Sequence, residues 1–505
     1  MPPRSDTVSA RVAFGRAKLS RAKVRRLQPS MVLKVLSSVA MTLAALQAGA
    51  ATLIVNDSTD VTAARDGQCT LREAVANVNA AMDISGGDCT AGSGAGDTIE
   101  FNLILPATIT LTTKGALAIS KDLHINGPTT GALAIDGNGQ TGVLSITAGV
   151  VSLANLIIQN GHAVGTAGGG VYNNGIVTLN NCTLSGNSAD ADTGNGGGLY
   201  NDSAGTATLT DCTLSGNSVT SDDFGGGGAG LYNAGTVTLT NCTFTNNVAS
   251  VGAGGGLYND HAGTATLTNC TLSGNSSGIV GGGFYNGGHA TLTNCTLGGN
   301  AAVNGDFNGS GGGLYTTVDG SSTLTNTIVA NSPGGENCVG LVLDAGHNLS
   351  SDGTCFSPDS INVDPRLAPL ANYGGQTATL ALCTAVGMPD PSCTGPSPAI
   401  DDGDDAVTGP PLNLDTDQRG LPRKAGLHVD LGADEVQSAA PPACVGDCDG
   451  SGEVTVDELV TMVNIALGIT PLPTCSAGDA DGSGNITVNE IIVAVNNALT
   501  ACPDS

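Results

Sequence analysis

A long string, GGGLYNDHAGTATLTNCTLSGN, occupies residues 254–275, and related copies of it recur six times between residues 168 and 331. The copies follow one another at intervals of 25 to 32 residues. Within each copy, apolar residues alternate with threonine, which is the period of a half-buried β-strand. A fixed repeat of this length, made of strands and Gly/Asn turns, predicts a solenoid of β-strands. The tyrosines that mark the copies are Tyr172, Tyr200, Tyr232, Tyr258, Tyr285 and Tyr315.

One copy shows how such a coil is expected to fill its interior. Leu267, Cys270 and Leu272 fall on the inward face, and Asn275 closes the turn. Stacked coils lie about 4.8 Å apart, the hydrogen-bonding distance between strands, so identical positions stack. Stacked asparagines then satisfy buried turn amides, glycines supply positive φ or close backbone approach, and threonines face solvent. The pattern predicts an all-β chain folded as a parallel β-helix.

Cysteine and asparagine also recur once per copy. We interpret the cysteines as a stack of small inward-facing hydrophobic side chains, in preference to a redox or metal site. The sixth copy has no cysteine and reads Thr325-Asn326-Thr327-Ile328, so we expect it to be an exit coil. The cysteines are Cys182, Cys212, Cys242, Cys270 and Cys295, and the asparagines are Asn187, Asn217, Asn247, Asn275, Asn300 and Asn331.

Composition agrees with a stacked core. The 505 residues include 75 glycines, 3% aromatic residues and no tryptophan, which is too little bulky apolar material for a globular core of this length. The 40% hydrophobic content, set in strict alternation, argues equally against disorder.

Residues 1–50 have the organisation of a secretory signal peptide. Basic residues extend to Lys34, an apolar run follows from 35 to 46, and Ala48-Gly49-Ala50 forms a cleavage site. The apolar run is too short to span a membrane. Met31 would begin a conventional leader by itself.

The chain after residue 50 is strongly acidic. It carries eight Lys or Arg against 43 Asp or Glu, a net charge of about −35. We expect an exported, soluble protein without a membrane span after signal cleavage, and poor affinity for nucleic acid and anionic membranes.

Export predicts disulfides among the fifteen cysteines. The ten cysteines outside the repeat fall as near neighbours: Cys69 with Cys89, Cys338 with Cys355, Cys383 with Cys393, and Cys444, Cys448, Cys475 and Cys502 together.

Residues 51–98 are expected to cap the solenoid. Residues 51–56 are typical of a strand, and Thr70 with Glu73 forms the capping box of a short helix. Such a helix can cover the unpaired edge of the first coil. Plain coils continue from residue 99 and the β-helix extends to 335. The apolar face of the capping helix is Leu71, Ala74, Val75 and Val78.

Three segments resemble known families. CTLREAVANVNAA followed by GDTIEFN is similar to the CSLREA segment found ahead of bacterial β-helical surface proteins. The repeat resembles the polymorphic outer-membrane-protein and pectate-lyase-like class, which implies a right-handed parallel β-helix. Residues 336–436, with Asn348-Leu-Ser-Ser-Asp-Gly-Thr-Cys355 and Asp430-Leu-Gly-Ala-Asp-Glu435, resemble the choice-of-anchor domain. That resemblance implies a C-terminal cover for the β-helix, and residues 437–443 are typical of a linker.

The C-terminal residues 444–505 contain two EF-hand loops, 447–458 and 479–490. Each loop has oxygen ligands at positions 1, 3, 5 and 12, glycine at position 6 and an apolar residue at position 8. Hard oxygen ligands on a tight turn suit Ca²⁺, so two calcium sites are predicted. The predicted ligands are Asp447, Asp449, Ser451, Glu453 through its carbonyl, Thr455 and Glu458, and Asp479, Asp481, Ser483, Asn485 through its carbonyl, Thr487 and Glu490.

Each loop runs into an amphipathic helix, and neither has a clear entering helix. This duplicated arrangement resembles a type I dockerin, which implies a small α-helical domain and a cohesin-like partner. Glutamate closes each loop where dockerins usually have aspartate, and Val456-Asp457 with Val488-Asn489 replaces the hydroxyl-bearing recognition pair. The resemblance to dockerins therefore supports calcium binding more strongly than it supports cohesin binding. The expected apolar faces are Leu459, Val463 and Ala466, and Ile491, Val495 and Ala498.

An active site is not evident in the repeat. Lyases of this fold use Arg or Lys, and residues 122–365 contain neither. Galacturonase-like hydrolases need clustered aspartates, but the available ones sit in Gly/Ala/Thr loops where aspartate is a common turn residue. We predict no catalytic residue. The weighed acidic groups are Asp202 with Asp211, Asp222 with Asp223, and Asp260 with His261; His162, His289 and His347 are interpreted as loop residues.

Two functions remain open. The first is a secreted or cell-surface protein that contacts a glycan or cell-surface ligand and attaches through its calcium module. The alternative is a dockerin-type extracellular enzyme, a polysaccharide lyase or glycoside hydrolase. A Thr-x-Thr array that binds ice or carbohydrate is a less favoured idea, since threonine is a common exposed strand residue. It comprises Thr208/Thr210, Thr238/Thr240, Thr266/Thr268, Thr291/Thr293 and Thr323/Thr325.

Overall fold

The structure, a computed structural model, describes residues 49–500 except for short internal gaps. The predicted signal peptide therefore lies outside the described residues, apart from its last two positions. Among the described residues, no helix combines the length and apolar character needed to cross a bilayer. The gaps are 63–64, 113–114, 191–194, 221–225, 304–310, 357–361, 438–443, 450, 452 and 480–484.

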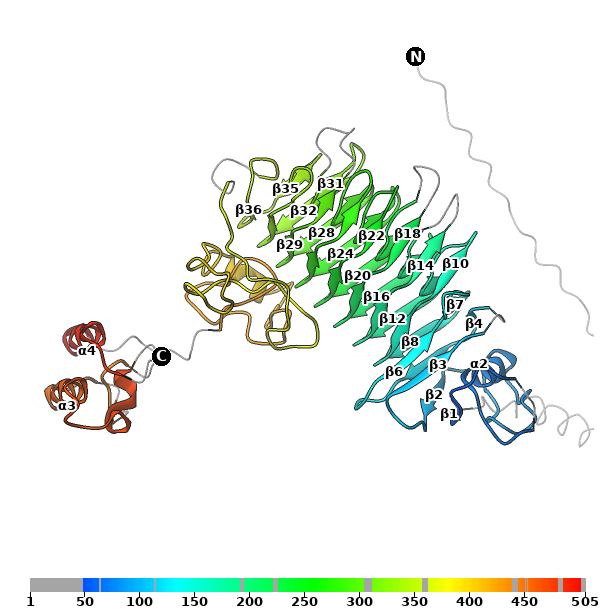
Figure 1. The fold of residues 1–505 in the computed structure, drawn as a ribbon, viewed down its shortest axis with the longest axis horizontal. Coiled ribbons are helices and arrows are strands. Elements are labelled where there is room, and N and C mark those ends of the chain that lie inside the picture. Colours follow the sequence, from blue (N-terminus) through cyan, green and yellow to red (C-terminus); the bar gives the residue numbers. More distant parts are fainter. Residues whose placement is uncertain are drawn as a thin grey trace, which may run out of the picture. The chain divides into compact units, whose positions relative to one another are not determined.

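Four sheets of parallel strands, formed by the described residues, wrap around one interior (Figure 1). The coils between residues 144 and 302 pass through all four in turn, whereas the described coils before and after them have strands in at most three. Sheet I has 11 strands: β1 (Thr52–Val55), β2 (Asp97–Phe101), β5 (Leu123–Asn126), β8 (Val150–Ala154), β12 (Ile176–Asn180), β16 (Thr206–Thr210), β20 (Thr236–Thr240), β24 (Thr264–Thr268), β28 (His289–Thr293), β32 (Ser321–Thr325) and β35 (Val342–Asp344). Sheet II has 10: β3 (Ala107–Thr110), β6 (Leu133–Asp136), β9 (Ile157–Gln159), β13 (Thr183–Ser185), β17 (Thr213–Ser215), β21 (Thr243–Thr245), β25 (Thr271–Ser273), β29 (Thr296–Gly298), β33 (Ile328–Ala330) and β36 (Leu349–Ser350).

The other two sheets complete the coil. Sheet III has six strands: β10 (His162–Val164), β14 (Ser188–Asp190), β18 (Ser218–Thr220), β22 (Val248–Ala249), β26 (Ser276–Ser277) and β30 (Ala301–Ala302). Sheet IV has nine: β4 (Leu117–Ile119), β7 (Leu144–Ile146), β11 (Val171–Asn173), β15 (Leu199–Asn201), β19 (Leu231–Asn233), β23 (Leu257–Asn259), β27 (Phe284–Asn286), β31 (Leu314–Thr316) and β34 (Cys338–Val339).

The interior has the predicted inward set. Leu267, Cys270 and Leu272 are fully buried, and their equivalents in neighbouring coils stack on them. The five ladder cysteines are free thiols in the core. Burial raises the pKa of the Cys242 thiol well above its ordinary value, so these side chains are inert hydrophobic filling, as predicted.

The sixth copy was expected to be an exit coil, and this expectation is wrong. A further coil, made of β34, β35 and β36, stacks on it in three of the sheets. Thr327 takes the cysteine position of the sixth copy, where it is fully buried and accepts a hydrogen bond from the Cys295 amide at 3.4 Å.

Buried asparagines join the coils along two ladders. In the predicted ladder, each Nδ2 donates to the Oδ1 of the next coil from Asn187 to Asn300, at 2.9 to 3.0 Å. Asn331 is exposed and does not belong to this ladder. A second ladder, which the sequence analysis missed, runs through the Tyr-Asn pairs of sheet IV from Asn173 to Asn286, with steps of 2.7 to 2.8 Å.

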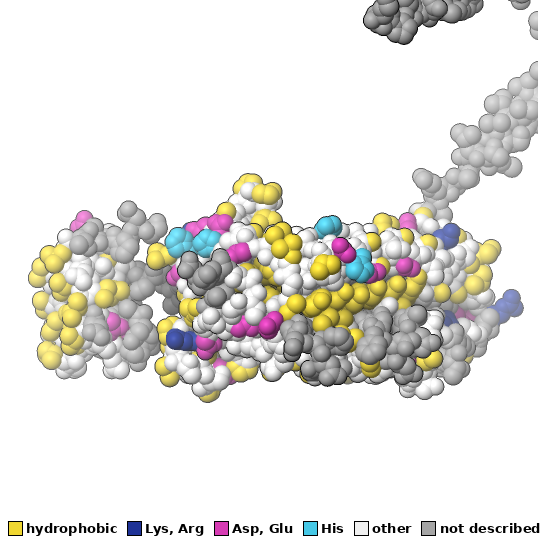
Figure 2. Space-filling view, turned by 90° about the horizontal axis from the view of Figure 1, so that it is seen from above, with side chains coloured by type: hydrophobic (Ala, Val, Ile, Leu, Met, Phe, Trp, Pro, Cys, Tyr) yellow, Lys and Arg dark blue, Asp and Glu magenta, His cyan; other side chains and the backbone are white. Residues whose placement is uncertain are grey.

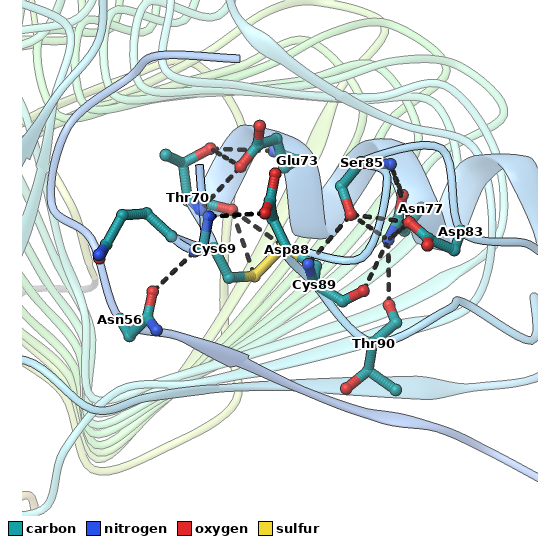
Figure 3. Close-up of a disulfide and its surroundings, with 12 residues drawn as sticks. Asn56, Cys69, Thr70, Glu73, Asn77, Asp83, Ser85, Asp88, Cys89 and Thr90 are labelled. Atoms are coloured by element: carbon teal, nitrogen blue, oxygen red, sulfur yellow. Dashed lines mark hydrogen bonds between the residues drawn. A yellow bond between two sulfur atoms is a disulfide. The ribbon is translucent and has the colours of Figure 1, made fainter. Parts of the chain in front are cut away.

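The N-terminal cap forms as predicted. Helix α2 (Leu71–Ala80) begins at Thr70 with a complete capping box, and its face of Leu71, Ala74, Val75 and Val78 is buried in the core of the solenoid. The Cys69–Cys89 disulfide closes the segment beside it (Figure 3). Asn77 of the helix fixes the segment that follows the helix, residues 84–90. Its Oδ1 accepts a hydrogen bond from the Ile84 amide at 2.8 Å, and its Nδ2 donates to the Thr90 carbonyl at 3.0 Å.

Residues 366–436, with the short helix η2 (Asp405–Thr408), pack against the side of sheet II. Thr271 bonds to Thr379 at 3.0 Å and to Gln418 at 2.6 Å, and Thr296 accepts from the Ala433 amide at 2.9 Å. Thr271, Thr296 and their neighbour Thr243 are consequently buried, whereas threonines of the repeat were expected to face solvent. The predicted disulfides Cys338–Cys355 and Cys383–Cys393 are present.

The C-terminal module, residues 444–500, contains α3 (Val456–Ala466), η3 (Leu472–Gly478) and α4 (Val488–Thr500). The module consists of two halves, each a loop followed by a helix, and they share one small core. Val454 and Ile486, at position 8 of the two loops, are both buried in that core. The Cys448–Cys475 disulfide links the halves covalently, and Cys444 is also disulfide-bonded. Cys502, the last cysteine of this group, lies outside the described residues.

The predicted apolar faces of these helices are wrong in four positions. Val463, Ala466, Val495 and Ala498 are exposed, while Leu459 and Ile491 are partly buried. The buried stripe begins one residue earlier, at Glu458 and Glu490, because these loop-closing carboxylates turn inward. It continues at Met462, Ile465 and Ala494.

Candidate functional site

The first C-terminal loop brings three carboxylates together. Oxygen atoms of Asp447, Asp449 and Glu458 all lie within 4.8 Å of one another. Asp447 and Glu458 are buried and Asp449 is exposed, so the cluster lies at the surface with one open side. Calcium–oxygen distances are about 2.3–2.6 Å, so oxygens around one ion are at most about 5 Å apart. The spacing of the three side chains thus fits a calcium ion.

The loop backbone is already wrapped around these carboxylates. The Ser451 amide donates to Asp447 at 2.9 Å and to Asp449 at 3.0 Å. One Glu458 oxygen accepts from the Cys448 amide at 2.7 Å and from the Asp449 amide at 3.2 Å. Burial of Glu458 raises its pKa, but the hydrogen bonds from Thr455, Cys448 and Asp449 outweigh that effect and the pKa is lowered. The carboxylate is therefore held in the ionised form that a metal requires.

Thr455, the predicted ligand at position 9, takes part in the capping box of α3. Its hydroxyl donates to the second Glu458 oxygen at 2.8 Å and accepts from the Glu458 amide at 3.4 Å, so the pair forms the capping box of α3. Thr455 thus positions the closing glutamate, and EF-hand position 9 often reaches the ion through water. Ser451 and Glu453 are exposed, and the Glu453 carbonyl accepts from the Ser451 hydroxyl at 3.3 Å.

The second loop repeats the part of this arrangement that the structure describes. Thr487 donates to Glu490 through its amide at 2.6 Å and through its hydroxyl at 2.9 Å. Asp479 is half-buried, Asn485 is exposed and Glu490 is buried. Asp481 and Ser483 lie outside the described residues, so convergence of the second ligand set stays a prediction.

Large apolar side chains are exposed at equivalent positions of α3 and α4. The exposed fraction exceeds one half at positions 456 and 460 of α3 and 467 just after it, and at 488, 492 and 499 of α4; the equivalent positions are 32 residues apart. Exposed apolar patches of this kind mark protein interaction surfaces. The side chains are Val456, Val460 and Leu467, and Val488, Ile492 and Leu499.

Asp202 and Asp211, weighed as a catalytic pair, lie at opposite ends of β16 and are not brought together. Asp202 lies in the turn after β15 and accepts a hydrogen bond from the Tyr172 hydroxyl at 2.6 Å. Asp211 lies on the far side of β16, where it accepts from Asn241 at 3.0 Å. The bond from Tyr172 lowers the pKa of Asp202, which keeps this carboxylate ionised and unsuited to act as a general acid. Asp222 and Asp223 lie outside the described residues.

The histidines make local contacts. His162 and His289 lie in strands, not in the expected loops, and each Nδ1 is bonded to a serine hydroxyl, at 2.7 Å for Ser188 and 2.8 Å for Ser321. The ring of His162 also lies 3.5 Å from Asp190. His347 does lie in a loop, where its Nδ1 contacts the Asp402 carbonyl at 2.8 Å. Asp260 lies in the turn after β23, where its side chain accepts from the amide of His261 at 2.8 Å.

The six repeat tyrosines form a continuous stack. Neighbouring ring centroids are 4.4 to 5.6 Å apart and the planes deviate by 5 to 18°. Burial, together with the hydrogen bond to Asp202, raises the pKa of Tyr172 to about 12. The sequence analysis used these tyrosines only to index the repeat, although their strict recurrence already implied the stack.

Comparisons with known proteins address the solenoid. A family model described as a right handed beta helix region matches residues 124–297 and 170–357. The crystal structure of pectate lyase Pel9A aligns with 77% of this chain and 97% of its own, at 15% identity and a TM-score of 0.44. No curated protein matches the sequence. The four parallel sheets and the family match together identify a right-handed parallel β-helix protein.

Proposed function

We propose that this is an exported calcium-binding β-helical protein that contacts carbohydrate or a cell-surface ligand and attaches through its C-terminal module. The convergence of Asp447, Asp449 and Glu458 within 4.8 Å is the observation that carries the proposal. Export is supported by the disulfides, which form and persist in oxidising compartments.

In the first loop, Asp447, Asp449, Ser451 and Glu458 would hold Ca²⁺ by side-chain oxygens and Glu453 by its carbonyl. The ion would supply the positive charge that the three carboxylates lack. The capping box of Thr455 and Glu458 ties the last ligand to the start of α3, so loop closure and helix orientation are coupled. The same coupling is expected between Thr487, Glu490 and α4.

Attachment would use the repeated apolar positions of the two helices. Because equivalent residues are exposed on both, a partner could engage either helix by the same contacts. A cohesin-like protein fits this chemistry, and the valines at the recognition positions would favour an apolar partner surface.

Calcium titration of the full chain by calorimetry tests the metal proposal. Two sites are expected, and Glu458→Gln and Glu490→Gln should each remove one. Glu453→Gln is the matched control, because this residue contributes only its backbone carbonyl, and it should bind two ions. Unchanged binding in both closing-glutamate variants would show that the EF-hand assignment is wrong.

Neutral glycans and polyuronates distinguish the two functions of the solenoid. We expect the full chain to bind neutral glycan without releasing new reducing ends or unsaturated products. Turnover that disappears in a variant carrying Asp202→Asn and Asp260→Asn would instead establish the polysaccharide-degrading enzyme.

A further inference from the structure

A hollow of about 640 Å³ opens in the N-terminal half of the solenoid, between β7, β10 and β11. This volume lies within the range of roughly 300–1,000 Å³ that is typical of small-molecule sites. Tyr172, Ser145 and His162 line it together with Gln140, Thr141 and Thr166. Asp202, Asp211 and Asp260, the weighed aspartates that the structure describes, do not line it.

The first cause of the hollow is that the tyrosine stack stops. On one side, the ring of Tyr172 stacks on Tyr200 at a centroid distance of 5.6 Å and 7° between planes. On the other side, the strand register places Ser145 next to Tyr172, and Ala118 follows it. A serine is too short to cover a phenol ring, so the outer face of Tyr172 borders the hollow instead of another ring.

The second cause is that sheet III begins at the same level. Its order runs from β10 to β30, and β10 pairs only with β14 among the described strands. Among the described residues, the coils that precede β10 in the chain have no strand in sheet III. The edge of β10 is therefore uncovered on that side, and it forms a step in the surface beside Tyr172. His162 stands on that step, and its bond to Ser188 at 2.7 Å orients the ring.

The ring of Tyr172 is held in place for contact with a ligand. Its hydroxyl donates to Asp202 at 2.6 Å, while Tyr200 supports the inner ring face. A rigid, flat and apolar ring face bordered by polar groups is the kind of surface on which a sugar ring can lie by its C–H face. The Gln140 amide and the Thr166 hydroxyl, on exposed residues at the rim, are suited to sugar hydroxyls.

The electrostatics select an uncharged ligand. None of the described residues that line the hollow is Lys or Arg, so a uronate or sulfate would meet no cation in the lining that they form. Figure 2 shows the same on the face drawn, where acidic and histidine side chains, but no lysine or arginine, lie along the middle of the solenoid. Asp190 and Asp202, close to the hollow, would repel anionic sugars further.

We infer that this hollow is a glycan subsite in which Tyr172 stacks against one neutral sugar ring. The inference rests on the proposed carbohydrate contact and assigns that contact to the end of the tyrosine stack. The inner tyrosines, from Tyr200 to Tyr285, have a structural role, since both of their ring faces are covered by other tyrosines.

Calorimetric and saturation-transfer NMR titrations of the full chain with neutral gluco-, manno- and xylo-oligosaccharides, and with oligogalacturonate, test the subsite. Binding is expected for a neutral oligosaccharide and not for oligogalacturonate. Tyr172→Ala should weaken it roughly tenfold or more, which corresponds to about 1.4 kcal/mol. Tyr315→Ala, at the other end of the same stack and next to Val339, is the matched control and should bind like the unaltered chain.

Ser145→Tyr provides a second test that does not depend on removing a stacked ring. The new tyrosine would extend the stack by one coil and fill the hollow, so binding should be lost while the thermal midpoint of unfolding is kept or raised. If binding of the neutral oligosaccharide survives both Tyr172→Ala and Ser145→Tyr, the assignment of this subsite is wrong. The proposed carbohydrate contact would then lie elsewhere on the chain. Absence of binding to every oligosaccharide would count against both the subsite and the proposed carbohydrate contact.

Discussion

In the solenoid, the buried asparagines of the two ladders are matched coil by coil, whereas in the C-terminal module three carboxylates of one loop lie within 4.8 Å of one another. Asn247 illustrates the first case, since its amide bonds to Asn275 and to the Leu214 carbonyl, both at 2.9 Å. Asp449 illustrates the second, since carboxylate oxygens of Asp447 and Glu458 lie within 4.8 Å of its own. The asparagines of the ladders therefore satisfy one another's polar groups, whereas we propose that the module depends on an added cation.

Removal of calcium should produce the largest difference in stability between the solenoid and the C-terminal module. Without a cation, repulsion among Asp447, Asp449 and Glu458 opposes closure of the loop, so α3 and α4 should lose protection. Hydrogen exchange of the full chain, with calcium and with chelator, measures both parts in one sample. We expect large loss of protection in residues 454–500 and none in the coils of residues 171–298. Equal protection of the module in both conditions would contradict the metal dependence.

Breaking an asparagine ladder should be the largest single change within the solenoid. Asn247→Ala leaves the Leu214 carbonyl and the Asn217 amide without their buried partner. Such orphaned groups cost about 1–3 kcal/mol each, so we expect a loss of about 3–5 kcal/mol in the free energy of unfolding.

Urea unfolding followed by circular dichroism measures this loss. Asn246→Gly is the matched control, because Asn246 is adjacent, exposed and at positive φ (54°), where glycine fits without strain. A loss in Asn247→Ala no larger than in the control would show that the ladder does not support the fold.

The ladders also show what the sequence could and could not predict. Period-2 alternation and strict recurrence were enough for the inward set of Leu267, Cys270 and Leu272. The second asparagine ladder was equally visible in the recurring Tyr-Asn pairs, but only the tyrosine of each pair was interpreted. Burial of Thr271 could not be predicted, because its partners Thr379 and Gln418 come from a segment without periodicity.

In the C-terminal module, loop spacing predicted that the carboxylates of Asp447, Asp449 and Glu458 converge, because an EF-hand loop fixes their order along the chain. The buried helix stripe was missed by one residue, since hydrophobicity alone does not reveal that Glu458 points inward. The hollow beside Tyr172 was beyond prediction from the repeat, because it arises where the repeat is interrupted: Ser145 replaces tyrosine and sheet III has not yet begun.

Not every buried charge outside the module is fully compensated, and pH should reveal this. Burial, with the negative charge of Asp430 beside it, raises the pKa of Glu435 to about 8, although the hydrogen bonds from the Asp430 and Ala425 amides and the attraction of Arg423 lower it. A carboxyl whose pKa is raised by folding stabilises the folded state below its ordinary pKa, and this stabilisation disappears as pH rises through 8. The free energy of unfolding of the segment packed on sheet II should therefore fall by roughly 1–3 kcal/mol between about pH 4.5 and pH 8.

Hydrogen exchange of residues 399–436 at pH 5, pH 6 and pH 8, corrected for the intrinsic rate, measures this effect. Glu435→Gln should remove the dependence between about pH 6 and pH 8 and leave the part below pH 6, where Asp430, whose pKa burial raises to about 6, still titrates. Asp402→Asn, on an exposed residue of the same segment, should leave the slope unchanged. A slope between pH 6 and pH 8 that persists in Glu435→Gln would assign the titration to another group.

The smallest effect on the free energy of unfolding is expected from replacing a cysteine of the solenoid, because the cysteines have different roles in the solenoid and in the C-terminal module. Cys448 is bonded to Cys475, whereas Cys242 is a free thiol whose Sγ donates to the Thr240 carbonyl at 3.2 Å. In the sixth copy Thr327 occupies the same ladder position and donates to the Thr325 carbonyl at 2.9 Å, so this environment accepts a hydroxyl. Cys242→Thr should therefore change the free energy of unfolding by less than about 1 kcal/mol, and Cys242→Leu, which adds volume to a filled core, should cost about 1–3 kcal/mol. Urea unfolding of the two variants decides the point: a large loss in Cys242→Thr would mean that the thiol itself, and not its size and its hydrogen bonding to backbone carbonyls, is required in the ladder.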